Sequence, residues 1–477
     1  MSFDIKPSKI SLVIGASSVG TLIEWYDFYI FGMLATIISK QFFPSDAGTS
    51  ALLSTLAIFA AGFIVRPFGA LVFGRLGDII GRKYTFLLTL VLMGGSTFAI
   101  GLVPGFATIG WAAPILVLIL RLVQGLALGG EYGGAATYVA EHAPANRRGF
   151  WTSWIQTTAT LGLFLALGVI ILIRSNQGVE AFSAEWGGWR YPFWMSIILV
   201  VVSILIRMKM SESPMFTKLK SEGKTSTNPL KESFGNKFNL KFVLLALFGA
   251  TMGQGVVWYT GQFYAMNFLK TVQSIDSSQV DTLLGIALLL GTPFFVFFGW
   301  LSDKVGRKVI MMSGMLIAIL AYRPIYRAMY ASTDLTLKTE IVEKTKVVPS
   351  LKEIDATKMD SIYTTTKAYT DGTTVEEIKT IHFESGKVMV DDKGKDKVET
   401  KVTKMINNSD RWFLVLMVFI QVIFVTMVYG PIAAFLVEMF PVKIRYTSMS
   451  LPYHVGNGIF GGLLPAISTY FVTTSKE

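Results

Sequence analysis

The sequence predicts an all-α membrane protein, a bundle of two related six-helix halves with a small polar insert in the second half. Three observations indicate this fold class. The chain has 477 residues, of which 52% are hydrophobic and only 16% are charged, whereas soluble domains carry about 25% charged residues. Apolar runs of about 20 residues recur along the chain, each long enough to cross a hydrocarbon core of about 30 Å as a helix. A motif of the first half also recurs in the second.

The apolar runs predict eleven membrane-spanning helices. The first run contains two acids and is too long for a signal peptide, so we interpret it as an uncleaved first helix. The expected spans are residues 11–38, 51–74, 84–104, 112–140, 150–174, 190–208, 241–270, 281–301, 308–330, 411–438 and 446–472.

The charges of the loops between these runs alternate, which predicts the orientation of the chain. One set of loops is rich in lysine and arginine, including Lys83, Arg147 and Arg148, whereas the short loops of the other set hold few cations. Basic loops lie on the cytoplasmic side of membrane proteins. We therefore expect a plasma (inner) membrane protein whose N-terminus and basic loops are cytoplasmic.

Residues 331–410 interrupt the apolar pattern. They are polar and rich in charged residues, with alternating threonine, valine and isoleucine and turn signals such as Asp371-Gly372. This composition favours either a small β-rich insert or a partly disordered loop, and counting spans places it on the extracytoplasmic side. The expected segments are an N-terminal bundle of helices 1–6 (1–208), a cytoplasmic linker (209–240), the first part of a C-terminal bundle (241–330), the insert (331–410) and the second part of that bundle (411–477).

An internal repeat divides the chain into two homologous halves. The segment FGRLGDIIGRK at 73–83 returns as FGWLSDKVGRK at 298–308, 225 residues later. Beyond the insert the spacing becomes 297 residues, as for Tyr132 with Tyr429. The difference, about 72 residues, is close to the length of the insert. Parallel halves around an axis along the membrane normal are a transporter architecture, and a six-helix first half implies a missing twelfth helix after the five spans of the second.

The composition also excludes several kinds of site. Without cysteine the chain has no disulfide, thiolate metal site or cysteine nucleophile, and its three histidines lie far apart in sequence. A phosphate-binding loop is missing, so we expect neither an enzyme nor a nucleotide-driven pump. The net charge of +11 indicates basic cytoplasmic loops rather than nucleic-acid binding. We expect a monomer in the lipid bilayer that uses no cofactor.

Several long motifs resemble those of the major facilitator superfamily. GRLGDIIGRK (74–83) and its second copy resemble the signature loop of that superfamily, and RLVQGLALGGEYGGA (121–135) resembles its fourth-helix motif. GTLIEWYDFYIFG (20–32) and SESPMF (211–216) are similar to segments of its metabolite:proton symporter family. The resemblance covers almost the whole chain except the insert. It implies a transporter that moves a small organic acid or zwitterionic osmolyte, such as a dicarboxylate, shikimate, proline or betaine, together with protons.

The signature loop supplies four candidate gating residues. Asp78 ends the second helix, where its carboxylate can cap a neighbouring helix or pair with Arg82. Asp303 and Arg307 repeat this arrangement in the second half. In the family such charges look like a latch that closes the cytoplasmic side, and the alternative is an anchor that only fixes the topology. We favour the latch because the motif is duplicated.

Glu24 and Asp27 lie in the first helix, three residues apart and therefore on one face. A carboxylate in hydrocarbon costs about 3 kcal/mol, so such residues are functional by default. Arg121 lies at overlapping depth inside the fourth helix, and a buried guanidinium needs an anionic partner. We predict that Asp27 is the counter-ion of Arg121 and that Glu24 carries the coupling proton. The two roles can also be exchanged, or the pair can be purely structural.

Other polar side chains of the spans are candidates for the same site. Glu131 can carry a proton or make a satisfied polar contact, and Arg66 can bind a substrate carboxylate or anchor the bundle. Trp258 can offer its ring face to a quaternary ammonium group or belong to an aromatic belt. For His454, buried polar packing is the alternative. The predicted substrate-binding residues are Arg66, Gln156, Gln254, Trp258, Tyr259, Gln262 and His454.

Two functions follow from these patterns. The first is a proton-coupled secondary transporter, a symporter that imports a small carboxylate or zwitterion by alternating access. The alternative is a membrane sensor or receptor whose extracytoplasmic insert binds a ligand. Transport into liposomes distinguishes the two, because a sensor does not accumulate solute.

Overall fold

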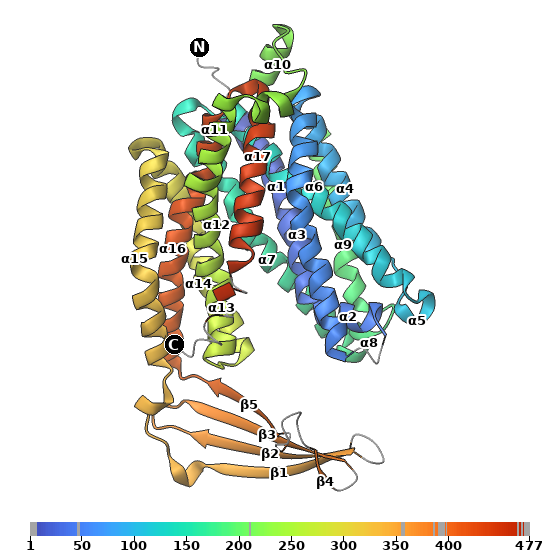
Figure 1. The fold of residues 1–477 in the computed structure, drawn as a ribbon, viewed down its shortest axis with the longest axis vertical. Coiled ribbons are helices and arrows are strands. Elements are labelled where there is room, and N and C mark those ends of the chain that lie inside the picture. Colours follow the sequence, from blue (N-terminus) through green and yellow to red (C-terminus); the bar gives the residue numbers. More distant parts are fainter. Residues whose placement is uncertain are drawn as a thin grey trace. The chain divides into compact units, whose positions relative to one another are not determined.

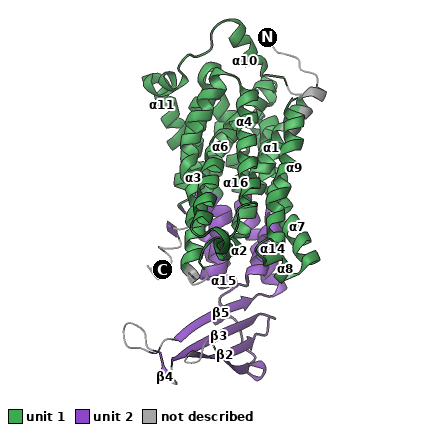
Figure 2. Ribbon diagram, turned by 90° about the vertical axis from the view of Figure 1, so that its right-hand side faces the viewer, with its two compact units in different colours: residues 1–258, 291–316, 424–463 green, residues 259–290, 317–423, 464–477 purple. Residues whose placement is uncertain are grey.

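The computed structural model describes residues 7–44, 48–208, 211–353, 358–384, 387–389, 396, 398–464, 467–468 and 471. It is mainly helical, with one small sheet (Figure 1). The chain forms two compact units, which Figure 2 shows in different colours. The first unit comprises residues 1–258, 291–316 and 424–463, and the second comprises 259–290, 317–423 and 464–477. The first sequence half lies entirely in the first unit, whereas the second half contributes to both units.

The helices of the first half follow the predicted apolar runs. The helix of the first run is interrupted at Leu34, where the axes of α1 and α2 meet at a bend of 64°. Shorter helices, α5 (Phe106–Ile109) and α8 (Val179–Ser183), lie in the connections. The long helices are α1 (Pro7–Met33), α2 (Ala35–Phe42), α3 (Gly48–Ile79), α4 (Arg82–Ile100), α6 (Ala112–His142), α7 (Arg148–Gln177) and α9 (Tyr191–Met208).

The second half begins with a short helix, α10 (Pro214–Ser221), and a seventh span that changes its winding several times. That span consists of α11 (Lys237–Ala246), α12 (Met252–Tyr259) and α13 (Ala265–Asn267), with π-helical turns at Leu247–Thr251, Thr260–Tyr264 and Phe268–Val272. The helices after it are α14 (Ser277–Val305), α15 (Arg307–Ser332), α16 (Asn408–Met439) and α17 (Arg445–Val455), the last continued by a π-helical stretch at Gly456–Gly461.

The number of spans agrees roughly with the eleven predicted. In the described part of the chain, nine helices are long and apolar enough to cross a membrane, or up to ten if the bent pair α1 and α2 is one span. The last predicted span, 446–472, begins as α17, and several of its residues lie outside the described ones.

Two glycines make the tight turns of the repeated motif. Gly81 separates α3 from α4 with φ +128°, and Gly306 separates α14 from α15 with φ +110°. Residues with a Cβ rarely adopt such backbone angles. The motif therefore ends one membrane span and starts the next within two residues in the first half and one residue in the second.

Small residues bring α3 and α6 into direct backbone contact. A Cβ on Gly125 would lie 2.2 Å from the carbonyl oxygen of Gly62, and one on Gly129 would lie 2.1 Å from that of Arg66. Because lipid provides no hydrophobic force between helices, such close packing is what holds membrane helices together. It fixes the positions of Arg66 and Arg121, which lie on these two helices.

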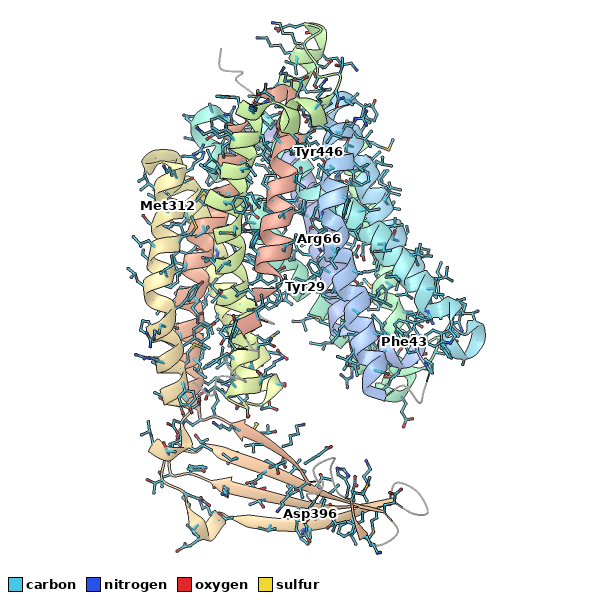
Figure 3. The ribbon with its side chains drawn as sticks, viewed as in Figure 1. Tyr29, Phe43, Arg66, Met312, Asp396 and Tyr446 are labelled. Carbon is cyan, nitrogen blue, oxygen red and sulfur yellow. The ribbon has the colours of Figure 1, made fainter. Side chains whose placement is uncertain are left out.

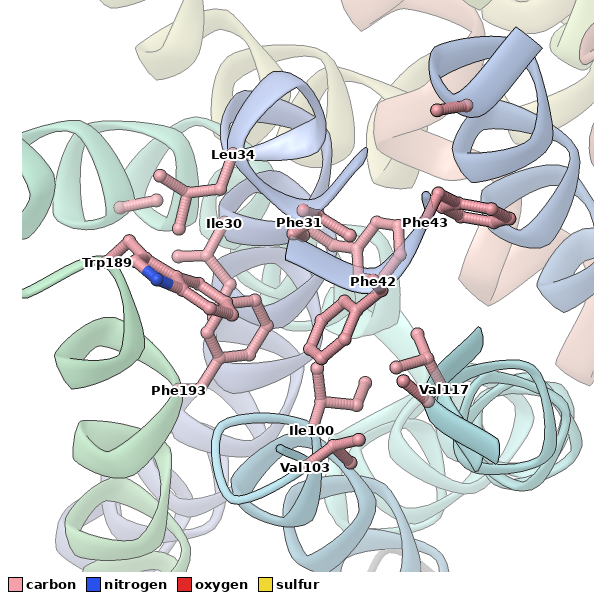
Figure 4. Close-up of a cluster of buried hydrophobic side chains, with 14 of the residues drawn as sticks. Ile30, Phe31, Leu34, Phe42, Phe43, Ile100, Val103, Val117, Trp189 and Phe193 are labelled. Atoms are coloured by element: carbon pink, nitrogen blue, oxygen red, sulfur yellow. The ribbon is translucent and has the colours of Figure 1, made fainter. Parts of the chain in front are cut away.

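A cluster of large apolar side chains fills one end of the first unit (Figure 4). Phe31 and Phe42 come from the two parts of the bent first span, and Trp189 and Phe193 come from the turn before α9 and from α9 itself. The Phe42 and Trp189 rings meet edge to face, with centroids 5.8 Å apart. The bend at Leu34 therefore lets α2 pack its apolar surface against the turn before α9.

The insert is a sheet, so the β-rich interpretation of residues 331–410 is confirmed. β2 (Lys358–Ala368) and β3 (Thr374–Glu384) form an antiparallel pair around the predicted Asp371-Gly372 turn, where φ of Gly372 is +88°. β1 (Lys346–Glu353) pairs with β2, while β4 (Lys387–Val388) and β5 (Val398–Met405) pair with β3.

Main-chain hydrogen bonds join this sheet to the chain before α14, within the second unit. The Lys404 amide donates to the Ser274 carbonyl at 2.7 Å, and the Asp276 amide donates to the Lys404 carbonyl at 2.9 Å. The last strand is thus held at the start of a membrane-spanning helix.

Candidate functional site

Asp78 joins the two sequence halves at one end of the first unit. Its carboxylate is fully buried and accepts hydrogen bonds from the Thr447 amide at 2.8 Å and the Thr447 hydroxyl at 2.7 Å. It also accepts a longer hydrogen bond from the amide of Tyr446, at the first turn of α17. Figure 3 labels Tyr446. Arg82 lies 3.1 Å from the same carboxylate. An anion at a helix N-terminus is stabilising because the amides there are unpaired and the helix dipole is positive.

Asp303 makes the same contact in the other half. Its two carboxylate oxygens accept from the Gly149 and Phe150 amides, both at 2.8 Å, at the start of α7. Arg307 lies 3.0 Å from it. Each motif aspartate thus caps a helix of the opposite half, and α7 and α17 are equivalent helices in the repeat. We call this end of the first unit, defined by Asp78 and Asp303, the motif end.

Further ion pairs surround each cap, and their acids are not among the site residues predicted from the sequence. Glu141 lies 3.0 Å from Arg445 and 3.4 Å from Arg82. Glu438, its equivalent in the repeat, lies 2.7 Å from Arg307. The sequence contains a signal for these pairs, because Glu141 and Glu438 are equivalent positions of the repeat, 297 residues apart. A charged pair that recurs in both halves is a candidate for the same role in each.

The backbones of the two halves touch at the motif end. A Cβ on Gly74 would lie 2.9 Å from the Thr447 Cα, and one on Gly149 would lie 2.4 Å from the Gly299 carbonyl oxygen. No solute fits between backbones at these separations. The motif end of the first unit is therefore closed.

Asp27 and Arg121 are connected, but not by the direct ion pair that the sequence suggested. The Thr97 hydroxyl donates to Asp27 at 2.7 Å, and the Gln124 amide donates to that hydroxyl at 2.8 Å. Arg121 in turn donates to the Gln124 side-chain oxygen. Gln124 follows Arg121 by one helical turn, so it reaches the guanidinium from the same helix. Two neutral side chains thus separate the charges.

Aromatic rings surround the Arg121 guanidinium on two sides. Its central carbon lies 4.7 Å from the centroids of both Phe31 and Phe59. Cation–π contacts of this kind gain strength when water is excluded, and Arg121 is 2% exposed. The negative faces of the two rings provide part of the electrostatic stabilisation that a buried guanidinium otherwise needs from a counter-ion.

Glu24 differs from the other buried acids of the first unit. Its side chain is 8% exposed, and the contacts found among the described residues include no hydrogen bond or ion pair for it. It interacts electrostatically with Arg66, Glu131 and Asp27. Arg66 lies over the Phe63 ring at 4.3 Å, and its Nε atom is buried without a hydrogen-bond partner. Figure 3 labels Arg66, on α3. The structure therefore holds an unpaired carboxyl group near a guanidinium that is not fully satisfied.

Glu131 occupies a satisfied position, one of the two roles considered for it. It is fully buried, lies 2.8 Å from Arg207 and accepts a hydrogen bond from Thr89, also at 2.8 Å. Its charge is thus balanced by a neighbouring helix. Of the two acids, Glu24 has the freer carboxyl group.

An aromatic wall lies between the two halves of the first unit. The Tyr132 and Tyr453 rings stack with centroids 3.7 Å apart and an angle of 5°. The Tyr453 and Tyr429 hydroxyls hydrogen-bond to each other, and Trp258 packs against Tyr429 at 4.5 Å and against Trp25 at 5.8 Å. Sequence patterns predict Trp258 as a site residue but not the tyrosines, although Tyr132 and Tyr429 are equivalent positions of the repeat.

The remaining predicted substrate residues are distributed around this wall. Gln156 donates to the Tyr132 hydroxyl at 2.8 Å, and Gln254 accepts from Asn457 at 2.9 Å. His454 is 3% exposed, and its Nε2 atom has no hydrogen-bond partner.

Tyr259 and Gln262 follow Trp258 on the seventh span and belong to the second unit. Within that unit the Tyr259 ring lies 5.2 Å from the Phe263 ring, and Gln262 is buried. Both residues lie at or beside the π-helical turn at Thr260–Tyr264, whose wider winding shifts the predicted four-residue stripe.

The chain is similar to known transporters. The model of the sugar (and other) transporter family matches residues 12–241. The chain is 35% identical over 318 residues to the proline/betaine transporter of Salmonella typhimurium, covering 65% of this chain and 63% of that protein's length. It is 35% identical over 314 residues to the alpha-ketoglutarate permease of Escherichia coli, covering 65% of this chain and 70% of the permease. A putative metabolite transport protein of Haemophilus influenzae is 32% identical over 463 residues, covering 96% of this chain and 87% of that protein.

The fold is similar to that of solved transporters. The proton:xylose symporter XylE bound to 6-bromo-6-deoxy-D-glucose superimposes with a TM-score of 0.65 at 17% identity, covering 98% of this chain and 91% of that chain. At this identity the likeness concerns the fold alone. These relatives are transporters and not enzymes. The chain therefore belongs to the major facilitator superfamily of membrane transporters, as its motifs predict.

Proposed function

We propose that this chain is a proton-coupled symporter that imports a small organic acid or zwitterion across the plasma (inner) membrane by alternating access. One observation carries the proposal: Glu24 is a buried carboxyl group without a hydrogen bond or ion pair among the described residues. Leaving a carboxylate unpaired in a low dielectric is costly, so its charge depends on what binds beside it. Proton coupling requires such a group.

Substrate and proton meet at Arg66 in this proposal. Its guanidinium, near Glu24, binds the carboxylate of the substrate, since Arg presents paired donors to planar anions. If the substrate is a betaine-like zwitterion, the ring face of Trp258 accepts its quaternary ammonium group. The solutes after which the relatives are named support this chemistry, because proline, betaine, alpha-ketoglutarate and shikimate all bear a carboxylate.

The motif end is the cytoplasmic gate in this proposal. The N-terminus is cytoplasmic and the insert is extracytoplasmic, in line with the basic loops beside Asp78 and Asp303. Breaking the aspartate caps on α7 and α17 then opens the site to the cytoplasm. No ion other than the proton is invoked.

Purified protein in liposomes tests the proposal with labelled betaine, proline, shikimate and alpha-ketoglutarate. A pH gradient that is acidic outside should drive accumulation of at least one of them. Glu24→Gln should abolish this accumulation while exchange down a substrate gradient survives. Glu180→Gln, an exposed position of α8, is the matched control and should behave as the parent protein. Gradient-driven accumulation by Glu24→Gln at the parent level excludes Glu24 as the proton carrier, and a protein that moves none of these solutes favours the sensor alternative.

A further inference from the structure

An apolar groove runs along the outside of the first unit between α7 and α14. Its volume is about 530 Å³. Thr157 is one of its few polar residues, and its hydroxyl already donates to the Trp154 carbonyl at 2.8 Å. The groove is lined mainly by large apolar side chains, namely Phe150, Trp154, Leu161, Pro293, Phe297 and Trp300.

The groove lies beside the point where the two helices touch. At the motif end Gly299 packs so tightly that a Cβ on it would lie 2.4 Å from the Ser153 Cβ. One turn further from that end, Trp154 and Thr157 on α7 face Val296 and Pro293 on α14 across the groove. Because α7 belongs to the first sequence half and α14 to the second, whatever fills the groove touches both halves.

The walls of the groove face hydrocarbon rather than water. Trp154 is 41% exposed and Phe297 is 45% exposed, although both lie in membrane-spanning helices. From Phe150 to Leu161 the groove follows eleven residue-to-residue steps of α7, about 16 Å at the rise of an α-helix. That length is close to half of the roughly 30 Å hydrocarbon core, the depth of one leaflet. The dimensions fit one acyl chain.

The side chain of Lys304 lies beside the groove, on the side nearest the motif end. The Lys304 ammonium is 4.1 Å from the centroid of the Trp300 ring, which lines the groove, and the Lys304 side chain is exposed. Lysine at a helix end extends its ammonium group to the level of the lipid headgroups. Its charge is complementary to a lipid phosphate.

We propose that a glycerophospholipid of the leaflet at the motif end binds here, with one acyl chain in the groove and its phosphate on Lys304. Because the bound chain packs against a helix of each half while Gly149 and Gly299 are in contact, the lipid should stabilise the closed motif end. This inference goes beyond transport itself and assigns a lipid site that regulates it.

Tryptophan fluorescence tests binding, because Trp154 and Trp300 line the groove and brominated acyl chains quench tryptophan on contact. Delipidated protein in detergent is titrated with brominated phosphatidylglycerol. Quenching should saturate, and most of the saturable part should disappear in the double variant Trp154→Phe and Trp300→Phe. Trp111→Phe, an exposed tryptophan elsewhere, should keep it. Quenching that rises in proportion to lipid without saturation, or that is equal in both variants, overturns the proposal.

Two variants separate the headgroup from the chain. Lys304→Gln should weaken binding about fivefold, the effect of one cation at a membrane surface, while Lys308→Gln, an exposed lysine on α15, should not. Thr292→Phe fills the groove and should abolish saturable quenching. Equal affinities of the two lysine variants exclude a phosphate contact at Lys304, and a dimer without lipid in native mass spectrometry shows that a second copy fills the groove instead.

The effect on the closed state needs a distance measurement. Because the chain has no cysteine, spin labels can be placed at Ala145→Cys and Val305→Cys alone, on opposite halves at the motif end. Added phosphatidylglycerol should increase the population with the shorter label distance in the parent background and leave it unchanged with Thr292→Phe. A distance distribution that does not respond to lipid in the parent overturns the regulatory part of the proposal.

Discussion

Asp27 is linked to Arg121 through two neutral side chains, and this arrangement has a measurable consequence. A direct buried pair is strongly coupled, because removing one partner leaves an unpaired charge. In the observed chain Thr97 and Gln124 carry part of the interaction. The phenylalanine rings beside Arg121 reduce the cost of losing Asp27 further.

We therefore expect moderate rather than full coupling between these residues. Asp27→Asn should lower the free energy of unfolding by about 1–2 kcal/mol. Combining it with Arg121→Gln should cost less than the sum of the single changes, by about 1 kcal/mol. Unfolding in detergent measures all three variants, and Asp27→Asn with Arg174→Gln, an exposed arginine, is the additive control. Strict additivity of the first pair would show that the chain of hydrogen bonds transmits nothing.

Acid sensitivity is expected at one residue of the insert. Partial burial by itself would raise the pKa of Asp371, but hydrogen bonds from Lys338 and Thr373 outweigh it and lower the pKa to about 2. A carboxyl group whose pKa is lowered by folding stabilises the fold above its unfolded pKa of about 4. That stabilisation is lost as the pH falls toward 2.

Pepsin, which is active in acid, measures this loss. Cleavage within residues 331–410 should be slow at pH 4 and become faster toward pH 2. Asp371→Asn, which cannot form the ion pair with Lys338, should be cleaved quickly at both pH values. If the variant is as resistant as the parent at pH 4, the Asp371 contacts do not hold the insert together.

At the scale of elements, the turns of the repeated motif depend on two backbone angles. Gly81 and Gly306 have φ values of +128° and +110°, which cost a residue with a Cβ about 1–3 kcal/mol. At Gly81 a Cβ would also lie 2.3 Å from the Glu212 carboxylate.

Gly81→Ala and Gly306→Ala should each destabilise the protein by about 1–3 kcal/mol. Gly95→Ala is the matched control, because Gly95 lies within α4 and a Cβ there meets nothing within 4 Å. It should be neutral or stabilising by up to about 1 kcal/mol. The midpoint of thermal unfolding in detergent ranks the three variants, and equal midpoints would contradict the argument from φ.

At the scale of the whole molecule, a single added side chain at the motif end should destabilise its closed state. A side chain on Gly299 collides with Ser153 of the opposite half. Gly299→Leu should therefore favour the open motif end, whereas Gly168→Leu on the open face of α7 should not. A cysteine introduced at the buried Ser450 position should react with a soluble maleimide several-fold faster in the first variant. Unchanged reactivity would show that the Gly149–Gly299 contact does not gate access.

The sequence predicted much of this architecture. The repeated motif and the shift in its spacing predict two halves and an insert in the second, because helix length and residue spacing can be read directly from a sequence. Side-chain geometry cannot. The Thr97 and Gln124 bridge depends on rotamers and on the approach of α4 to α6, and the stack of Tyr132 on Tyr453 depends on how two distant helices meet. Residue type and depth alone could pair Asp27 with Arg121, but they could not exclude intervening groups.

The wide turns of the seventh span have a mechanical consequence. A π-helical turn accommodates more residues than an α-helical turn, and each residue of an α-helix corresponds to about 100° of rotation. Converting one wide turn into regular helix therefore rotates everything beyond it while keeping the backbone hydrogen-bonded. Trp258 lies between two such turns, Leu247–Thr251 and Thr260–Tyr264. The span can turn its aromatic face about its own axis without tilting and without breaking in the membrane.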